Sequence, residues 1–118
     1  MPPRSAENLS LLQGTLDMLI LRTLQAGPAH GHQIAKYIQR TSDSALQVEH
    51  GSLYPALHRL EGKGLLAARW EAAGEGLVRE YKYYRLTTKG RRELARQESR
   101  WKQMAEAVAR IMWPVKES

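Results

Sequence analysis

The chain contains no cysteine among its 118 residues. This absence excludes disulfides, thiolate metal sites and thiol nucleophiles, and it is consistent with a reducing compartment. The histidines do not replace them as metal ligands, because His30 and His32 are two residues apart and such a pair does not share a helix face. We therefore expect no metal and no other cofactor.

Long apolar runs and catalytic signatures are missing as well. No segment approaches the roughly 20 apolar residues that span a bilayer, and no apolar signal-peptide core follows the N-terminus. We find no paired carboxylates, no nucleophile with a base, and no phosphate-binding glycine loop. These observations favour a cytoplasmic protein that is not an enzyme and does not contact a membrane.

Basic residues are concentrated in one half of the chain. The net charge is +6, with four Lys/Arg and four Asp/Glu in residues 1–51. Residues 59–92 hold nine Lys/Arg against four Asp/Glu. A merely basic protein would have the same total, but this uneven distribution is typical of a face that binds a polyanion.

Residues 51–61 have the pattern of a short helix with two different faces. Ser52 is the expected N-cap, which places Pro55 near the third helical position, where its missing N–H has no helical partner. The three- and four-residue spacing predicts an apolar face of Leu53, Ala56, Leu57 and Leu60. The outward face then carries Tyr54, Pro55, His58 and Arg59.

The segments before this helix predict the rest of a helix-turn-helix. A first helix is expected from Asn8 or Ser10 to Ala26, and a second from Gly31 to Arg40. Residues 47–49 could form a very short strand. The first helix is apolar on more than one face, so we expect a second subunit to cover part of it.

A β-hairpin and a long helix complete the pattern. Residues 65–71 and 79–86 read as strands joined by a flexible turn at 72–76, which makes a wing. The predicted fold is mainly α with a small β-wing: a winged helix-turn-helix domain over residues 8–87. A dimerisation helix over residues 88–113, capped by Thr87 or Thr88, forms one compact unit with it.

The last helix is predicted to dimerise because its apolar residues keep an approximate heptad spacing. At about 26 residues, or roughly 39 Å, it is also longer than a domain of this size would cover. The expected interface, which could also hold an effector, comprises Trp101, Leu12, Leu16, Leu94, Met104 and Val108.

Four motifs in the sequence resemble the PadR family of bacterial transcriptional regulators. They are residues 11–19, the Gly-His-Gln-Ile of 31–34, residues 51–61, and residues 82–87 followed by Gly90. The resemblance covers roughly residues 9–101. It implies a homodimer that binds a partly palindromic DNA operator, usually as a repressor, with the helix near Ser52 in the major groove and the wing on the flanking backbone.

The resemblance also implies an effector site in some members, where a tryptophan of the last helix stacks on a small aromatic ligand. Trp101 occupies the similar position, although packing in the dimer seam is the favoured explanation for it. The chain departs from the family at Glu80, which would repel phosphate in the wing, and at His32, where members often carry tyrosine. If His32 lies near DNA, its protonation should tighten binding slightly at low pH.

Two hypotheses of different class follow. The first is a sequence-specific DNA-binding regulator; the alternative is a winged-helix interaction and dimerisation module without DNA binding. In the first case we expect double-stranded DNA to contact Ser52, Tyr54, Pro55, His58, Arg59, Lys36, Lys63, Arg79 and Lys82, with Arg85 as a further phosphate contact.

Overall fold

The computed structural model describes residues 13–73, 76 and 79–116. The expected start of the first helix, at Asn8 or Ser10, and the interface residue Leu12 lie outside this part of the chain. Within it, the elements follow in the order α1 (Gln13–Gln25), β1 (Ala29–His30), α2 (Gly31–Thr41), α3 (His50–Gly62), β2 (Leu66–Ala73), β3 (Arg79–Leu86) and α4 (Thr88–Met112).

The strands form an antiparallel sheet in the order β1-β3-β2. The hairpin of β2 and β3 pairs from Leu66 opposite Leu86 to Ala73 opposite Arg79, which confirms the predicted wing. The strand expected at 47–49 is wrong, because these residues belong to no strand. The third strand is instead β1, where Ala29 lies opposite Tyr84.

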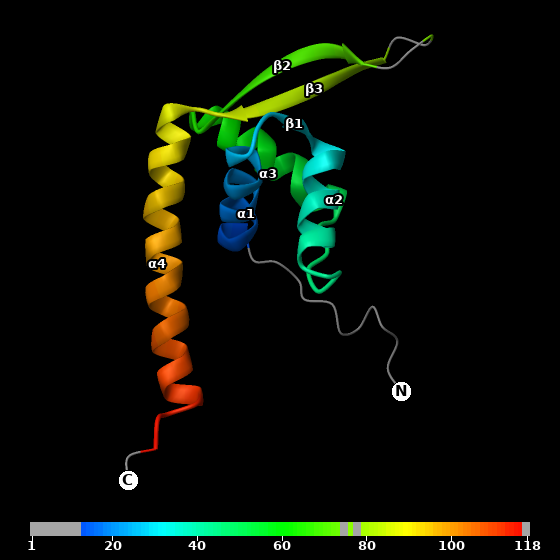
Figure 1. The fold of residues 1–118 in the computed structure, drawn as a ribbon. Coiled ribbons are helices and arrows are strands. Elements are labelled where there is room, and N and C mark those ends of the chain that lie inside the picture. The colour runs from blue at the N-terminus through cyan, green and yellow to red at the C-terminus, as the bar shows by residue number, and fades with distance from the viewer. Residues whose placement is uncertain (1–12, 74–75, 77–78, 117–118) are drawn as a thin grey trace, which may run out of the picture.

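One apolar core holds the helices to the sheet. Figure 1 shows α1, α2 and α3 together on one side of the sheet. All three helices and both long strands contribute to this core, and a fully buried leucine or isoleucine contributes about 1.5–3 kcal/mol. Its most buried side chains are Ile20, Leu21, Leu24, Ile34, Leu53, Leu57, Leu60 and Leu66.

A compact joint connects the end of α3, the end of β3 and the start of α4. The Thr87 hydroxyl lies 2.7 Å from the carbonyl oxygen of Gly64 and 3.0 Å from that of Leu65. It also accepts the Gly90 N–H at 2.9 Å, which makes Thr87 the N-cap of α4, as expected. We call Gly64, Leu65, Thr87 and Gly90 the joint.

From the joint, α4 runs along α1 and then extends beyond it. Leu94 is buried, but most residues after Gln97 are exposed. In Figure 1, α4 stands on one side of the domain while the wing reaches out on the other. Although α4 is 25 residues long, neither it nor any other described helix is long and apolar enough to cross a membrane.

Candidate nucleic-acid interface

The helix α3 has one buried and one exposed face, as its sequence predicts. Leu53, Ala56, Leu57 and Leu60 are buried in the core. The side chains of Ser52, Tyr54, Pro55 and His58 are exposed. We call these four residues the recognition face, because they form the polar surface that α3 offers to a partner.

The start of α3 differs from the prediction. The N-cap is Glu49, which makes no side-chain capping hydrogen bond, and the first helical residue is His50. Ser52 is therefore not the N-cap, and its N–H donates to the Glu49 carbonyl at 3.0 Å. Pro55 is the sixth helical residue rather than about the third, so it cannot donate the usual helical hydrogen bond to the Gly51 carbonyl.

Arg59 does not lie with Tyr54 and His58 on the outward face, so that part of the prediction is wrong. Its Nη2 donates to Oδ1 of Asp17 on α1 at a distance of 2.7 Å. The side chains of Arg59 and Asp17 are only 30% and 10% exposed. This ion pair turns the guanidinium back against the domain and connects α3 to α1.

The ion pair between Asp17 and Arg59 fixes the position of α3 more than it stabilises the fold. Burial raises the pKa of Asp17, and the attraction of Arg59 does not fully offset this effect. The Nε of Arg59 is also buried and has no hydrogen-bond partner among the described residues, which costs roughly 1–3 kcal/mol. Buried pairs of this kind are often no more stable than apolar residues of similar volume.

Breaking this pair on one side should destabilise the protein. We expect Arg59→Leu to lower the free energy of unfolding by about 2 kcal/mol, because it leaves the Asp17 carboxylate buried and unpaired. The double variant Asp17→Leu/Arg59→Leu should recover most of this loss. Urea denaturation at one fixed protein concentration measures both. A double variant less stable than Arg59→Leu would contradict a positioning role for the pair.

Lys82 of the wing also points toward the helices. Its Nζ donates to Oε1 of Glu61 at 3.0 Å and lies 5.3 Å from the ring centre of Tyr84. The hydrogen bond to Glu61 raises the pKa of Lys82, against the opposing effect of burial. The structure therefore gives Lys82 an internal partner where the sequence suggested a DNA phosphate.

The other basic residues expected at the interface have exposed side chains. Lys36 lies on α2, Lys63 caps the end of α3, and Arg79 and Arg85 lie on β3. Glu80 is exposed beside Arg79. An exposed side chain is required for a phosphate contact. The negative charge of Glu80 reduces the net positive charge of this part of the wing.

An exposed tryptophan on the wing was missed by the sequence reasoning. Trp70 of β2 is 63% exposed and lies opposite Lys82 in the sheet register. Opposite residues share one face of a hairpin, so Trp70 is on the face that carries Lys82 and Tyr84. The alternation of residues in β2 predicts the face of the hairpin on which Trp70 lies. Only the folded structure shows that the helices leave Trp70 exposed.

Four aromatic rings form a row beside the recognition face. The ring centres of His30 and His32 are 6.5 Å apart, those of His32 and His50 are 6.1 Å apart, and those of His50 and Tyr54 are 5.6 Å apart. A Cβ atom on Gly31 would lie 2.8 Å from the Tyr54 ring. Glycine there lets Tyr54 pack on the first turn of α2. We call these four rings the histidine row.

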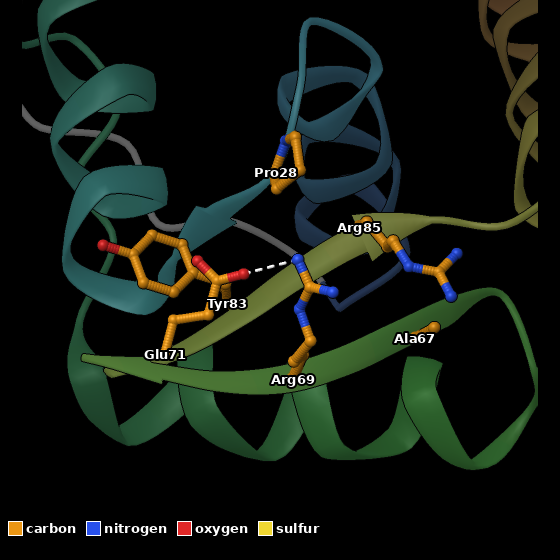
Figure 2. A pocket seen from close by; sticks show the side chains of 6 residues that line it. All are labelled: Pro28, Ala67, Arg69, Glu71, Tyr83 and Arg85. Carbon is orange, nitrogen blue, oxygen red and sulfur yellow. Dashed lines mark ion pairs between the residues drawn. The ribbon is translucent and has the colours of Figure 1, made fainter. Parts of the chain in front are cut away.

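A shallow hollow lies on the outer face of the wing. Figure 2 shows Arg69 and Arg85 extending from neighbouring strands, with Arg69 paired to Glu71 at 2.5 Å. Because Arg69 already has this partner, we assign no ligand to the hollow. Its volume is about 340 Å³, and its lining residues are Pro28, Ala67, Arg69, Glu71, Tyr83 and Arg85.

The expected dimer interface separates into two groups. Leu16 and Leu94 are 3% and 2% exposed within the core of their own domain, so their assignment to an interface is wrong. Trp101, Met104 and Val108 instead lie on the projecting part of α4 and are 51%, 66% and 48% exposed. With the similarly exposed Ile111, these three form what we call the α4 seam.

This arrangement defines a winged helix-turn-helix protein. A helix with an exposed polar face follows α2 and a turn, a two-stranded wing follows that helix, and a long α-helix closes the chain. The sequence pattern of the transcriptional regulator PadR-like family matches residues 20–96. The chain belongs to this family. It is therefore a DNA-binding transcriptional regulator rather than an enzyme.

Two solved structures and one sequence relative are similar to this chain. A PadR family transcriptional regulator from Eggerthella lenta is 35% identical, with a TM-score of 0.71 over 87% of this chain and 86% of the other. A PadR family regulator from Clostridium difficile is 28% identical, with a TM-score of 0.70 over 82% and 97%. An uncharacterized Lysinibacillus sphaericus protein is 28% identical over 86% of this chain and 92% of its own.

Proposed function

We propose that the protein represses transcription by binding a partly palindromic DNA operator as a homodimer in the cytoplasm. The observation that carries this proposal is the recognition face, an exposed helical surface whose opposite side is buried in the core. Two such faces related by a two-fold axis suit successive major grooves, about one helical turn apart. Family membership supports the DNA target.

The structure suggests a division of roles among the side chains. Tyr54 and His58 face the bases, while Lys36, Lys63 and Arg79 contact phosphates on either side. Arg59 and Lys82 keep α3 and the wing in place through their internal ion pairs. Under this proposal, an Arg59 substitution weakens binding to all duplexes, since it displaces the helix instead of removing a base contact.

The α4 seam provides the proposed contact between subunits. Its exposed apolar residues follow a heptad spacing, which is typical of helices that pair. Trp101 at the start of the seam would also offer a stacking surface to a small aromatic effector. Quenching of tryptophan fluorescence by planar aromatic compounds, absent in Trp101→Leu, tests the effector.

Salt dependence of DNA binding tests the proposed function directly. The probe is a labelled duplex that the purified protein selects from a random library, compared with a scrambled duplex. Each phosphate contact releases counterions, so we expect affinity to fall at least 100-fold between about 50 and 200 mM salt. Tyr54→Ala/His58→Ala should remove the preference for the selected duplex, whereas Lys36→Ala/Lys63→Ala should weaken binding to both duplexes alike.

The alternative function makes the opposite prediction for the same measurement. A winged-helix interaction module would bind no duplex in a salt-sensitive way and would retain a protein partner when used as bait. That pair of results would overturn the proposal of operator binding.

A further inference from the structure

The histidine row has a half-buried and an exposed end. At the half-buried end, the ring of His30 stacks on Tyr81 of β3 at 4.8 Å and lies edge to face with Tyr83 at 5.5 Å. At the other end, His32 and His50 are exposed beside the recognition face. The three histidines therefore have different surroundings although their rings form one continuous row.

His30 has a structural task that requires its neutral form. Its Nδ1 accepts the Gln33 N–H at 3.4 Å, and Oε1 of Gln33 accepts the His30 N–H at 3.0 Å. These reciprocal bonds cap α2. Burial, and to a lesser degree the positive charge of His32, lowers the pKa of His30. Protonation of Nδ1 would break the cap, so His30 serves as a neutral support.

His32 and His50 come from different helices and point their rings at one another edge to face, with the planes 72° apart. The nearest titratable and charged groups are His30 at the end of β1, Lys36 one turn further along α2, and Glu49 and Tyr54 at the start of α3. Tyr81 and Tyr83 of β3 contact His30 on the far side of the row. Within the described residues, no carboxylate forms an ion pair with either histidine. If His32 and His50 were both protonated, their positive charges would repel each other. An anion bound between them would offset this repulsion.

We propose that His32 and His50 together hold one phosphate of the DNA backbone beside the recognition face, and that each histidine takes up a proton from solvent as it does so. This inference rests on the proposed function, because it places the phosphate of a bound duplex. Binding to the protonated form makes operator affinity depend on pH, with tighter binding at low pH.

A phosphate suits this pair better than a metal ion. A structural metal site needs about four ligands, and the described residues contain no group of three or more side chains suited to one. A phosphodiester needs only hydrogen-bond donors and positive charge, which two imidazolium rings supply. The neighbouring Tyr54 ring, 5.6 Å from His50, places this contact next to the base-reading surface.

Anisotropy titrations at two pH values test the inference. The probe is the selected labelled duplex, at pH 6.0 and pH 8.0, with equal ionic strength and EDTA present. Wild type should bind roughly tenfold more tightly at pH 6.0, because the two imidazole rings carry more positive charge there than at pH 8.0. The ratio should fall to about two or less in His32→Gln/His50→Gln, and it should persist in Arg110→Gln, which removes a positive charge from the last turn of α4, outside the proposed DNA-binding surface.

Histidine chemical shifts give a second readout that a change in folding would not imitate. On adding the duplex, the titration midpoints of His32 and His50 should move to higher pH, while His30 should stay neutral. A wild-type ratio near one, or a ratio retained in the double variant, would overturn the inference while leaving salt-sensitive DNA binding intact. Absence of salt-sensitive binding at both pH values would overturn the inference and the proposed function together.

Discussion

Replacing Gly90 with alanine should destabilise the protein by about 3 kcal/mol, although alanine is the better helix former by about 1 kcal/mol. A Cβ atom on Gly90 would lie 2.1 Å from the carbonyl oxygen of Leu65 and 2.8 Å from Cδ1 of Leu86. The first of these is a backbone atom of the joint, so it cannot move aside like a flexible side chain. Steric overlap therefore outweighs helix propensity.

Gly62→Ala is the matched control for this substitution. Gly62 ends α3, and in the part of the chain that the structure describes a Cβ atom there would have no neighbour within 4 Å. We expect Gly62→Ala to be neutral or to stabilise the protein by up to about 1 kcal/mol. Thermal and urea unfolding compare the two variants. If Gly90→Ala were as stable as Gly62→Ala, the close approach of α4 to the joint would be refuted.

Charging the α4 seam should separate the subunits. The double variant Met104→Glu/Val108→Glu places two carboxylates on a surface that is apolar in the wild type, and a two-fold axis would bring four of them together. We expect a monomer in sedimentation velocity and a loss of operator affinity of at least 100-fold, because the second half-site is no longer held close to the first. The monomer should stay folded, since both side chains are exposed.

Ser99→Glu controls for added charge on the same helix. Ser99 is exposed and, at 100° per residue, lies on the opposite side of α4 from the seam. This variant should remain dimeric and should bind its operator nearly as the wild type does. A dimer that survives Met104→Glu/Val108→Glu would show that another surface joins the subunits.

The repeating elements of this fold could be predicted from the sequence because their signals are local. The alternation in residues 79–86 gave β3 with its observed bounds, and the buried side of α3 followed from the spacing of its apolar residues. The Thr87 cap of α4 was one of two neighbouring candidates. In each case, the atoms that decide the structure lie within a few residues of one another.

The errors concern interactions that join distant parts of the chain. Arg59 seemed to face outward because its partner Asp17 lies 42 positions earlier, on another helix. Lys82 is held by Glu61, which is 21 positions away. A basic residue on a polar helix face or strand looks the same in the sequence whether it contacts DNA or an internal carboxylate, so only the packing of α1, α3 and the wing distinguishes the two.

Two further errors have physical causes of a different kind. The helix α3 begins without a side-chain cap at Glu49, so Ser52 offered a more familiar signal three residues too late. The strand β1 has only two residues and exists because β3 supplies its hydrogen-bond partners. The histidine row was not predicted for a similar reason, since α2 and α3 bring its members together.

The joint at Thr87 would affect the spacing between the DNA-binding surfaces of two subunits. Through it, hydrogen bonds connect the end of α3, the end of the wing and the first turn of α4. In a dimer joined along α4, the angle between the two long helices would then set the distance and tilt between the two recognition faces. The spacing of the recognition faces would thus be determined by helix packing far from the DNA. A ligand bound at the α4 seam would act by changing the angle between the two α4 helices.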